Sequence, residues 1–289
     1  MTIISNENIL LAGYGYLGQY IIEEINNTKK NYNITTLSRS NKISVPNINH
    51  ITSNFDENTR IEFDNNSRVI YMAPPSNATL EDTRLQNFLS NIVSSEIKSL
   101  LYISTSGIYG NHNGLSVNEN TKPTPNTNRA KRRLDAEEKI KVFAEEKNIS
   151  YVILRVPGIY GPDRLPIDKI KKNIPLIKID ESPLTNLINV KDLARLVIAT
   201  QTNNLENEII NVSDGKPIKV TNYYLKICNV MNFAIPNFIS INEAKKIFDE
   251  KRLSFLLESR SLDVTKMKKL LPGCIKFENL ETGIKDSLK

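Results

Sequence analysis

The chain has 289 residues, of which 39% are hydrophobic and 24% are charged, a composition typical of a globular protein with one large or two moderate domains. Its two cysteines and two histidines offer neither a disulfide framework nor a metal site, so we expect no metal ion and a reducing, cytoplasmic setting. Neither a signal peptide nor an apolar run near the roughly 20 residues of a membrane span is visible, so we expect no membrane contact.

The net charge of +6 raises the question of a nucleic-acid partner. Basic residues cluster at 131–133, 169–172 and 266–269, each within a helical pattern that also carries acidic residues. Such clusters are typical of solvated helix faces. None is interleaved with aromatic residues in the way of a nucleic-acid-binding module, so we expect no nucleic-acid partner.

Six short apolar runs in the first half have the character of β-strands: residues 9–12, 34–38, 50–53, 69–72, 100–104 and 151–155. Amphipathic patterns between them predict helices over residues 17–26, 80–95 and 129–147. This alternation is the signal of parallel βαβ units. We therefore predict an α/β fold, a doubly wound parallel sheet of the Rossmann type with helices on both faces.

After Pro157 the pattern changes, because prolines break residues 157–185 into short pieces. Beyond them we predict a helix over 191–200, a strand over 208–212, and helices over 220–230, 242–248 and 264–270. We assign residues 1–160 to the Rossmann domain and residues 161–289 to a smaller C-terminal α/β substrate lobe. Residues 186–202 are expected to pack back on the Rossmann half, with a cleft between the lobes.

The first predicted strand runs directly into Gly-Tyr-Gly-Tyr-Leu-Gly at the start of a helix, which is the context of a dinucleotide-binding G-x-G-x-x-G turn. Gly13 would allow the tight turn, Gly15 would let the backbone approach a pyrophosphate, and Gly18 would permit close packing of helix on strand. Tyr16 and Leu17 lie at the helix N-terminus, whose partial positive charge faces the phosphates.

The end of the second predicted strand indicates the type of cofactor. NAD-binding units place an acidic residue there, which binds the ribose 2′-hydroxyl. Here the strand ends in Ser38 and Arg39 instead. A guanidinium at this point pairs with a 2′-phosphate, and the serine adds a hydroxyl donor. We therefore predict NADP as the cofactor, with NAD as the alternative.

Four further blocks follow the glycine turn in order: residues 102–110 (YISTSGIYG), 154–162 (LRVPGIYGP), 186–194 (NLINVKDLA) and 210–215 (INVSDG). With that turn they resemble the extended short-chain dehydrogenase/reductase superfamily, in its NAD-dependent epimerase/dehydratase group, over nearly the whole chain. The resemblance implies further cofactor-binding residues. Asn54 and Phe55 would lie under the adenine, Ala73, Pro74 and Pro75 would border the nicotinamide ribose, and Pro157 would border the cofactor where the two halves meet.

The family relies on a Ser or Thr together with Tyr-x-x-x-Lys, in which the tyrosine transfers a proton and the lysine lowers its pKa. Thr105 best matches the hydroxyl position, with Ser106 as the alternative. When the chain is aligned with the family at Ala136 and its neighbour Glu137, Arg129 and Arg133 occupy the positions of the tyrosine and the lysine. No tyrosine occurs between residues 109 and 151. The chain is therefore an atypical member.

Arginine cannot transfer protons near neutral pH. We expect Arg133 to hold the cofactor ribose and Arg129 to orient an anionic substrate group. The leading hypothesis is an NADP(H)-dependent oxidoreductase that acts on a small, polar, anionic molecule. The alternatives are a catalytically silent protein that senses NADP(H) and a sugar-nucleotide epimerase or dehydratase. A second copy of the chain, in a homodimer, is the one macromolecular partner left open.

Overall fold

The structure is a computed structural model, and it describes residues 7–28, 30–40, 48–92 and 97–289. Its centre is a seven-stranded sheet in the order β12-β7-β5-β4-β1-β2-β3, in which all neighbouring strands are parallel. The strands are β1 (Glu7–Ala12), β2 (Tyr32–Ser38), β3 (Ile48–Thr52), β4 (Ser67–Tyr71), β5 (Ile97–Thr105), β7 (Ser150–Val156) and β12 (Glu208–Asn211). The predicted doubly wound fold is confirmed, and each strand ends within about three residues of its prediction.

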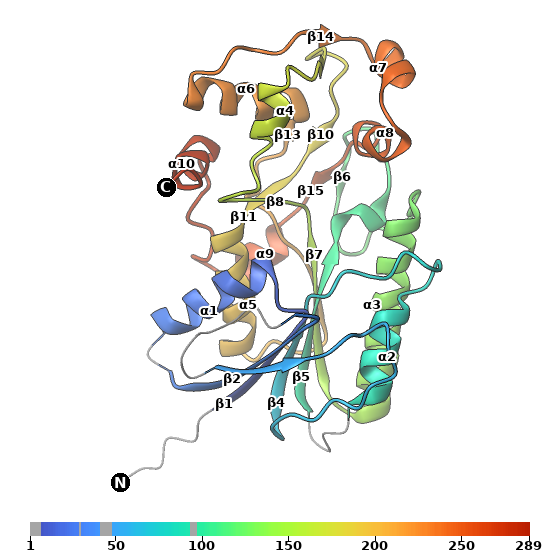
Figure 1. Cartoon of the computed structure of the whole chain (residues 1–289), viewed down its shortest axis with the longest axis vertical. Helices are drawn as coiled ribbons and strands as arrows, with labels where there is room; N and C mark the ends of the chain where they lie inside the picture. The colour runs from blue at the N-terminus through green and yellow to red at the C-terminus, as the bar shows by residue number, and fades with distance from the viewer. Residues whose placement is uncertain (1–6, 29, 41–47, 93–96) are drawn as a thin grey trace.

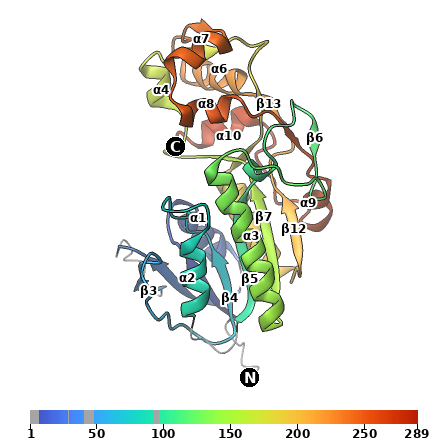
Figure 2. The ribbon, with the colours of Figure 1, turned by 90° about the vertical axis from the view of Figure 1, so that its right-hand side faces the viewer.

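Helices cover both faces of this sheet. On one face lie α1 (Tyr16–Asn27) and α5 (Val190–Thr202), and on the other lie α2 (Thr83–Asn91) and α3 (Asn128–Lys147) (Figures 1 and 2). Alternate side chains of a strand point to opposite faces, so β1 contributes to two separate cores. Ile9 and Leu11 are buried with α1 and α5, whereas Leu10 is buried with α2 and α3.

The remaining predicted helices are also present. They are α6 (Val220–Met231), α7 (Ile241–Ile247) and α9 (Thr265–Leu270). Helix α2 begins later than predicted because the Asp82 carboxylate accepts a hydrogen bond from the backbone N–H of Leu85 at 3.1 Å and so caps it. Residues 93–95 of that prediction lie outside the described residues. Within the described ranges, no helix is long and apolar enough to cross a membrane.

The upper part of the molecule is built from short elements that the sequence did not predict individually (Figure 1). They are α4 (Ile167–Lys171), β9 (Leu176–Ile177), β10 (Leu184–Thr185), β13 (Ile218–Lys219), β14 (Phe238–Ile239), α8 (Glu250–Leu256) and α10 (Leu280–Asp286). With α6 they enclose a small core that includes Tyr160, Ile227 and Ile284. A strand of two residues is too short to show a hydrophobic periodicity, so the sequence pattern does not predict it.

Segments beyond residue 160 also lie on the large sheet. Strand β12 pairs with β7, and α5 packs against α1. The two-residue strand β15 (Ser261–Leu262) pairs with β6 (Ser116–Val117), and Leu262 is buried in the sheet's core together with Val264. The two halves of the chain thus share a core, and the domain boundary at residue 160 stays a prediction.

The expectation that the basic cluster at 131–133 is a solvated helix face is wrong for Arg132. Its side chain is buried, and its guanidinium donates hydrogen bonds to Thr79 O at 2.8 Å and to Asn77 Oδ1 at 3.0 Å. Arg132 therefore fastens the loop between β4 and α2 to α3. Of this cluster only Lys131 is exposed as expected of a solvated face, and Arg133 is partly buried.

Candidate functional site

The glycine turn lies at the carboxyl end of β1. Gly13 has a φ of +83°, and a Cβ there would lie 2.5 Å from the backbone N of Ala73, so the turn requires glycine. The N–H groups of Gly13 and Tyr14 both donate to Leu37 O, at 3.0 and 2.7 Å. At Gly15, by contrast, a Cβ would meet nothing closer than Gly13 O at 3.9 Å. The backbone at Gly15 is therefore open to a ligand at the start of α1.

The other residues of the turn have structural contacts. A Cβ on Gly18 would lie 2.7 Å from the ring of Tyr14, so this glycine makes room for that ring, and its predicted role in helix–strand packing stays a prediction. The Tyr16 hydroxyl donates to Pro162 O at 2.8 Å, and Leu17 is buried in the core. Tyr16 thereby ties the first turn of α1 to the segment that enters the upper part of the molecule.

A cavity of about 180 Å³ opens beside this turn, and we call it the glycine-turn cavity. It is lined by Gly13, Tyr14, Gly15, Ser38, Arg39, Ser53, Phe55, Ala73, Pro74 and Arg84. Six of the predicted cofactor-binding residues are thus brought together with Phe55, which lies over Tyr71 at 5.8 Å between ring centroids. Arg39 is exposed, whereas the Ser38 hydroxyl donates to Ser40 O at 2.7 Å.

Asn54 and Pro75 were predicted beside these residues but do not line this cavity. Asn54 accepts a hydrogen bond from the backbone of Asp56 at 3.2 Å, and its amide donates to Glu57 Oε1 at 2.7 Å. Its side chain therefore shapes the loop after β3. Pro75 lies next to the lining residue Pro74 but is not itself part of the wall.

Arg133 points inward from α3, between the ends of β4 and β5. Its Nη1 donates to the Tyr102 hydroxyl at 2.9 Å, to Ile103 O at 3.0 Å and to Ala73 O at 3.5 Å. These acceptors sit at the carboxyl edge of the sheet, where ligands of open parallel sheets bind. The guanidinium therefore lies where a cofactor that crosses this edge would pass.

A second cavity, of about 290 Å³, lies between the sheet and the upper part, and we call it the interlobe cavity. Thr105, Ser106 and Pro157 line it from the sheet side, together with Arg129 of α3; Leu184, Asn186, Phe255, Glu258 and Arg260 are among the residues that line it from the other side. Thr105 Oγ1 accepts from Gly107 N at 3.1 Å, and so caps the 3-10 turn η1 (Ser106–Tyr109).

Arg129 and Glu258 both line this cavity. The Arg129 guanidinium lies over the ring of Phe255 at 4.2 Å. Its pKa is lowered by desolvation at the cavity wall, a shift that the Glu258 carboxylate opposes. The Glu258 and Arg260 side chains are each 13% exposed and pair at 2.9 Å. Glu258 Oε1 and Arg260 Nε are buried atoms that have no hydrogen-bond partner within the described residues, so each keeps hydrogen-bonding capacity that this ion pair does not use.

The segment around Glu258 is fixed by loops from distant parts of the chain. The Asn186 side chain donates to Arg260 O at 3.0 Å and accepts from Leu262 N at 2.9 Å. The N–H groups of His112 and Gly114 both donate to Ser259 O at 3.0 Å. These bonds hold Glu258 against the end of β5, and they depend on the pairing of β15 with β6.

Beneath Thr105 a buried ion pair connects α3 to the sheet. Glu137, which is fully buried, pairs with Arg155 of β7 at 2.8 Å and accepts a hydrogen bond from Ser104 Oγ at 2.5 Å. Arg155 Nη1 also donates to the Tyr109 hydroxyl at 2.8 Å. Because burial of both charges is compensated by these bonds, the pair fixes α3, and with it Arg129 and Arg133, against the carboxyl edge.

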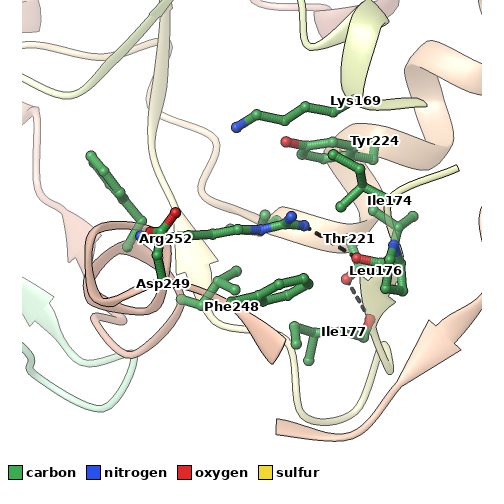
Figure 3. Close-up of a pocket in the computed structure, with 13 residues that line it drawn as sticks. Lys169, Ile174, Leu176, Ile177, Thr221, Tyr224, Phe248, Asp249 and Arg252 are labelled. Atoms are coloured by element: carbon green, nitrogen blue, oxygen red, sulfur yellow. Dashed lines mark hydrogen bonds between the residues drawn. The ribbon is translucent and has the colours of Figure 1, made fainter. Parts of the chain in front are cut away.

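A third cavity, of about 550 Å³, lies in the upper part and is called here the upper-lobe cavity (Figure 3). Its walls are mostly apolar, and Phe255 lines both this cavity and the interlobe cavity. Arg252 lies with its guanidinium 3.5 Å from the centroid of the Phe248 ring and donates to Pro175 O at 3.2 Å. Figure 3 shows Lys169 and Tyr224 on the side of this arginine opposite to Phe248.

The profile of the family described as "NAD dependent epimerase/dehydratase family" matches residues 9–213. The chain belongs to this family. The match begins in β1, includes the glycine turn and η1, and ends just after β12. Glu258 and Arg260, which complete the interlobe cavity in this family member, lie beyond the matched residues.

Individual proteins are similar to this chain in sequence or in fold. A putative UDP-glucose 4-epimerase from Methanocaldococcus jannaschii is 26% identical over 248 residues, 75% of this chain and 79% of the relative. A conserved protein of unknown function from Silicibacter pomeroyi has a TM-score of 0.84 at 21% identity, with 98% of each chain covered. UDP-N-acetylglucosamine 4-epimerase from Methanobrevibacter ruminantium, solved with UDP-N-acetylmuramic acid, has a TM-score of 0.74 at 18% identity and covers 98% and 97%.

Sequence reasoning missed several residues that line the glycine-turn and interlobe cavities, among them Arg84, Phe255, Glu258 and Arg260. None lies in a motif, and each reaches its cavity from a segment far from the glycine turn or from η1. The one available signal is the sequence Glu-Ser-Arg over 258–260, in which two opposite charges sit close together. That signal is too common to identify a site.

Proposed function

We propose that this protein is an NADP(H)-dependent oxidoreductase that acts on a small polar substrate with an anionic group. The observation that carries the proposal is the arrangement at the sheet's carboxyl edge: an open glycine turn with Arg39 beside it, and a separate cavity with hydroxyl and charged groups. The glycine-turn cavity and the unobstructed backbone at Gly15 fit a dinucleotide. The bound dinucleotide would supply or accept a hydride.

Different residues of the chain would bind different parts of the cofactor. Gly13, Gly15 and the N-terminus of α1 would hold the pyrophosphate, and Arg39 would pair with the 2′-phosphate. Arg133, between the ends of β4 and β5, would donate to the nicotinamide ribose. Pro157 would border the cofactor where it meets the interlobe cavity.

In the interlobe cavity, Thr105 and Ser106 would donate hydrogen bonds to the substrate oxygen, and Arg129 would pair with the anionic group. Neither arginine can exchange a proton at neutral pH. Within the described lining of this cavity no tyrosine occurs, and Glu258 is the one carboxylate. The Glu258 carboxylate would therefore accept the proton of a substrate hydroxyl.

A second candidate is a sugar-nucleotide epimerase, the activity in the names of several relatives. One observation favours it: Phe255 lines both the interlobe and the upper-lobe cavity, so the two cavities adjoin, and an elongated ligand that occupied both would pass this residue. The absence of the family's tyrosine from the described cavity wall counts against it, because that residue performs the proton transfer in the family.

Titration with NADPH and NADH tests the proposal. We expect NADPH to bind at least about tenfold more tightly by calorimetry, since a charge-assisted pair with Arg39 contributes roughly 1.5–3 kcal/mol, and to raise the melting temperature more. Arg39→Asp should reverse the order, because a carboxylate repels the 2′-phosphate. Equal affinity for both cofactors would contradict the NADP assignment.

Activity separates the enzyme from a cofactor sensor. The protein is incubated with NADPH and a panel of carbonyl compounds that includes keto acids and UDP-sugars. Consumption of NADPH that is lost in Glu258→Gln but kept in Lys131→Gln, an exposed control, supports the oxidoreductase. Tight NADPH binding without any turnover would favour the catalytically silent alternative.

A further inference from the structure

Arg84, the second residue of α2, lines the glycine-turn cavity opposite Gly15 and Arg39. Its side chain is only 17% exposed, which is unusual for an arginine at the start of a helix, where a cation is unfavourable to the helix dipole. Its position is therefore determined by contacts with other segments.

Three N–H donors at the edge of the Arg84 guanidinium form hydrogen bonds within the protein. Nε and Nη2 donate to the two carboxylate oxygens of Asp56, both at 2.6 Å, and Nη1 donates to Pro74 O at 3.1 Å. This bidentate geometry fixes the plane of the group. Because the edge is occupied, the planar face is the part of Arg84 that is left to form the cavity wall.

Asp56 lies between two cations. Arg84 lowers the pKa of the Asp56 carboxyl by hydrogen bonding, and Arg39 contributes a smaller decrease. Asp56 is therefore ionised at neutral pH. Without Arg84, the negative charge of Asp56 would be unpaired within range of Arg39 and would weaken the attraction of that arginine for a phosphate.

We propose that Arg84 is a specificity-determining residue of the cofactor site, with two separable roles. Its guanidinium face stacks on the adenine ring of the dinucleotide, and its pairing with Asp56 masks a carboxylate that would otherwise repel the 2′-phosphate at Arg39. This inference rests on the proposed binding of NADP(H). Planar arginine faces stack well on aromatic rings, whereas lysine lacks such a face.

Substitutions that remove one role at a time test this inference by calorimetric titration with NADPH and NADH. Arg84→Lys keeps the charge near Asp56 but removes the planar face, so both cofactors should bind about fivefold to tenfold more weakly, with their ratio unchanged. Arg84→Met removes both roles, so NADPH should lose a further factor of about five relative to NADH. Adding Asp56→Asn to Arg84→Met should restore the ratio but not the lost affinity.

Arg60→Met is the matched control, because Arg60 pairs with Glu62 at 2.8 Å in an exposed ion pair whose side chains are 68% and 70% exposed. It should leave both affinities within about twofold, and thermal melts should confirm that all variants are folded. If Arg84→Lys and Arg84→Met bind both cofactors as Arg60→Met does, the inference is overturned. If the double variant keeps the altered ratio, the masking role is refuted. A parent protein that binds neither cofactor would overturn the proposed function as well as this inference.

Discussion

Gly13 and Gly15 belong to one motif, but only one of them is required by the fold. Gly13 is required by the chain itself, because its φ is +83° and the backbone of Ala73 occupies the space of a Cβ. Gly15 is not required by the fold, since a side chain there would enter open space. The motif predicts two different roles for these glycines, and the structure adds a physical reason for each: a steric block at Gly13 and open space at Gly15.

This difference leads to a paired prediction. Gly15→Val should abolish binding of NADPH while the melting temperature stays within a few degrees of the parent, because the branched side chain blocks only the approach of a pyrophosphate. Gly13→Ala should instead destabilise the protein by at least about 1–2 kcal/mol, the cost of the left-handed conformation for a residue with a Cβ. Titration with NADPH and urea denaturation measure the two effects, and a Gly15→Val protein that binds like the parent would show that the cofactor is held elsewhere.

At the scale of elements, the position of α3 decides where Arg129 and Arg133 lie. The helix prediction over 129–147 is confirmed by α3 (Asn128–Lys147), but its rotation about its axis is set by contacts. Glu137 points into the sheet to Arg155, and Arg133, one turn earlier, consequently points to the edge between β4 and β5.

The Glu137–Arg155 pair should therefore be important for stability. Arg155→Met leaves a buried carboxylate without a partner and should reduce the free energy of unfolding by about 3–5 kcal/mol, measured by urea denaturation. Replacing both residues, as Glu137→Leu with Arg155→Met, should cost less than Arg155→Met alone, because no buried charge remains. A double variant whose loss equals the sum of the two single losses would mean that the two side chains are not coupled.

At the scale of the whole molecule, the sheet depends on chain segments from both halves. Strand β12 covers the edge of β7, α5 covers one face next to α1, and the segment that begins with β15 adds Leu262 and Val264 to the core. The Rossmann half is thus incomplete when the chain is cut at the predicted boundary.

A fragment of residues 1–160 should consequently fail to fold by itself. It would expose the edge of β7 and the apolar face that α5 covers, and such surfaces favour aggregation. We expect no cooperative thermal transition by circular dichroism, and recovery of that transition when residues 161–289 are co-expressed. A fragment that melts cooperatively on its own would instead support an independent domain at this boundary.

The sequence by itself determined the strands of the large sheet, most helices and the glycine turn, because hydrophobic periodicity and glycine geometry are properties of local segments. It also predicted the family, which is visible in ordered motifs and is confirmed by the family match, whereas the departure from the Tyr-x-x-x-Lys pair stays a prediction. Phe55 and Ala73 were predicted near the cofactor by resemblance, and the structure places both in the wall of the glycine-turn cavity.

Only the tertiary structure decided which further side chains share the cavities. Arg84 meets Asp56 because α2 starts beside the loop after β3, and Glu258 reaches Arg129 because β15 pairs with β6. Neither contact has a local signature, since a two-residue strand and an ion pair across many residues leave no periodic pattern. Their positions result from the packing of the whole chain on one sheet, which no single segment encodes.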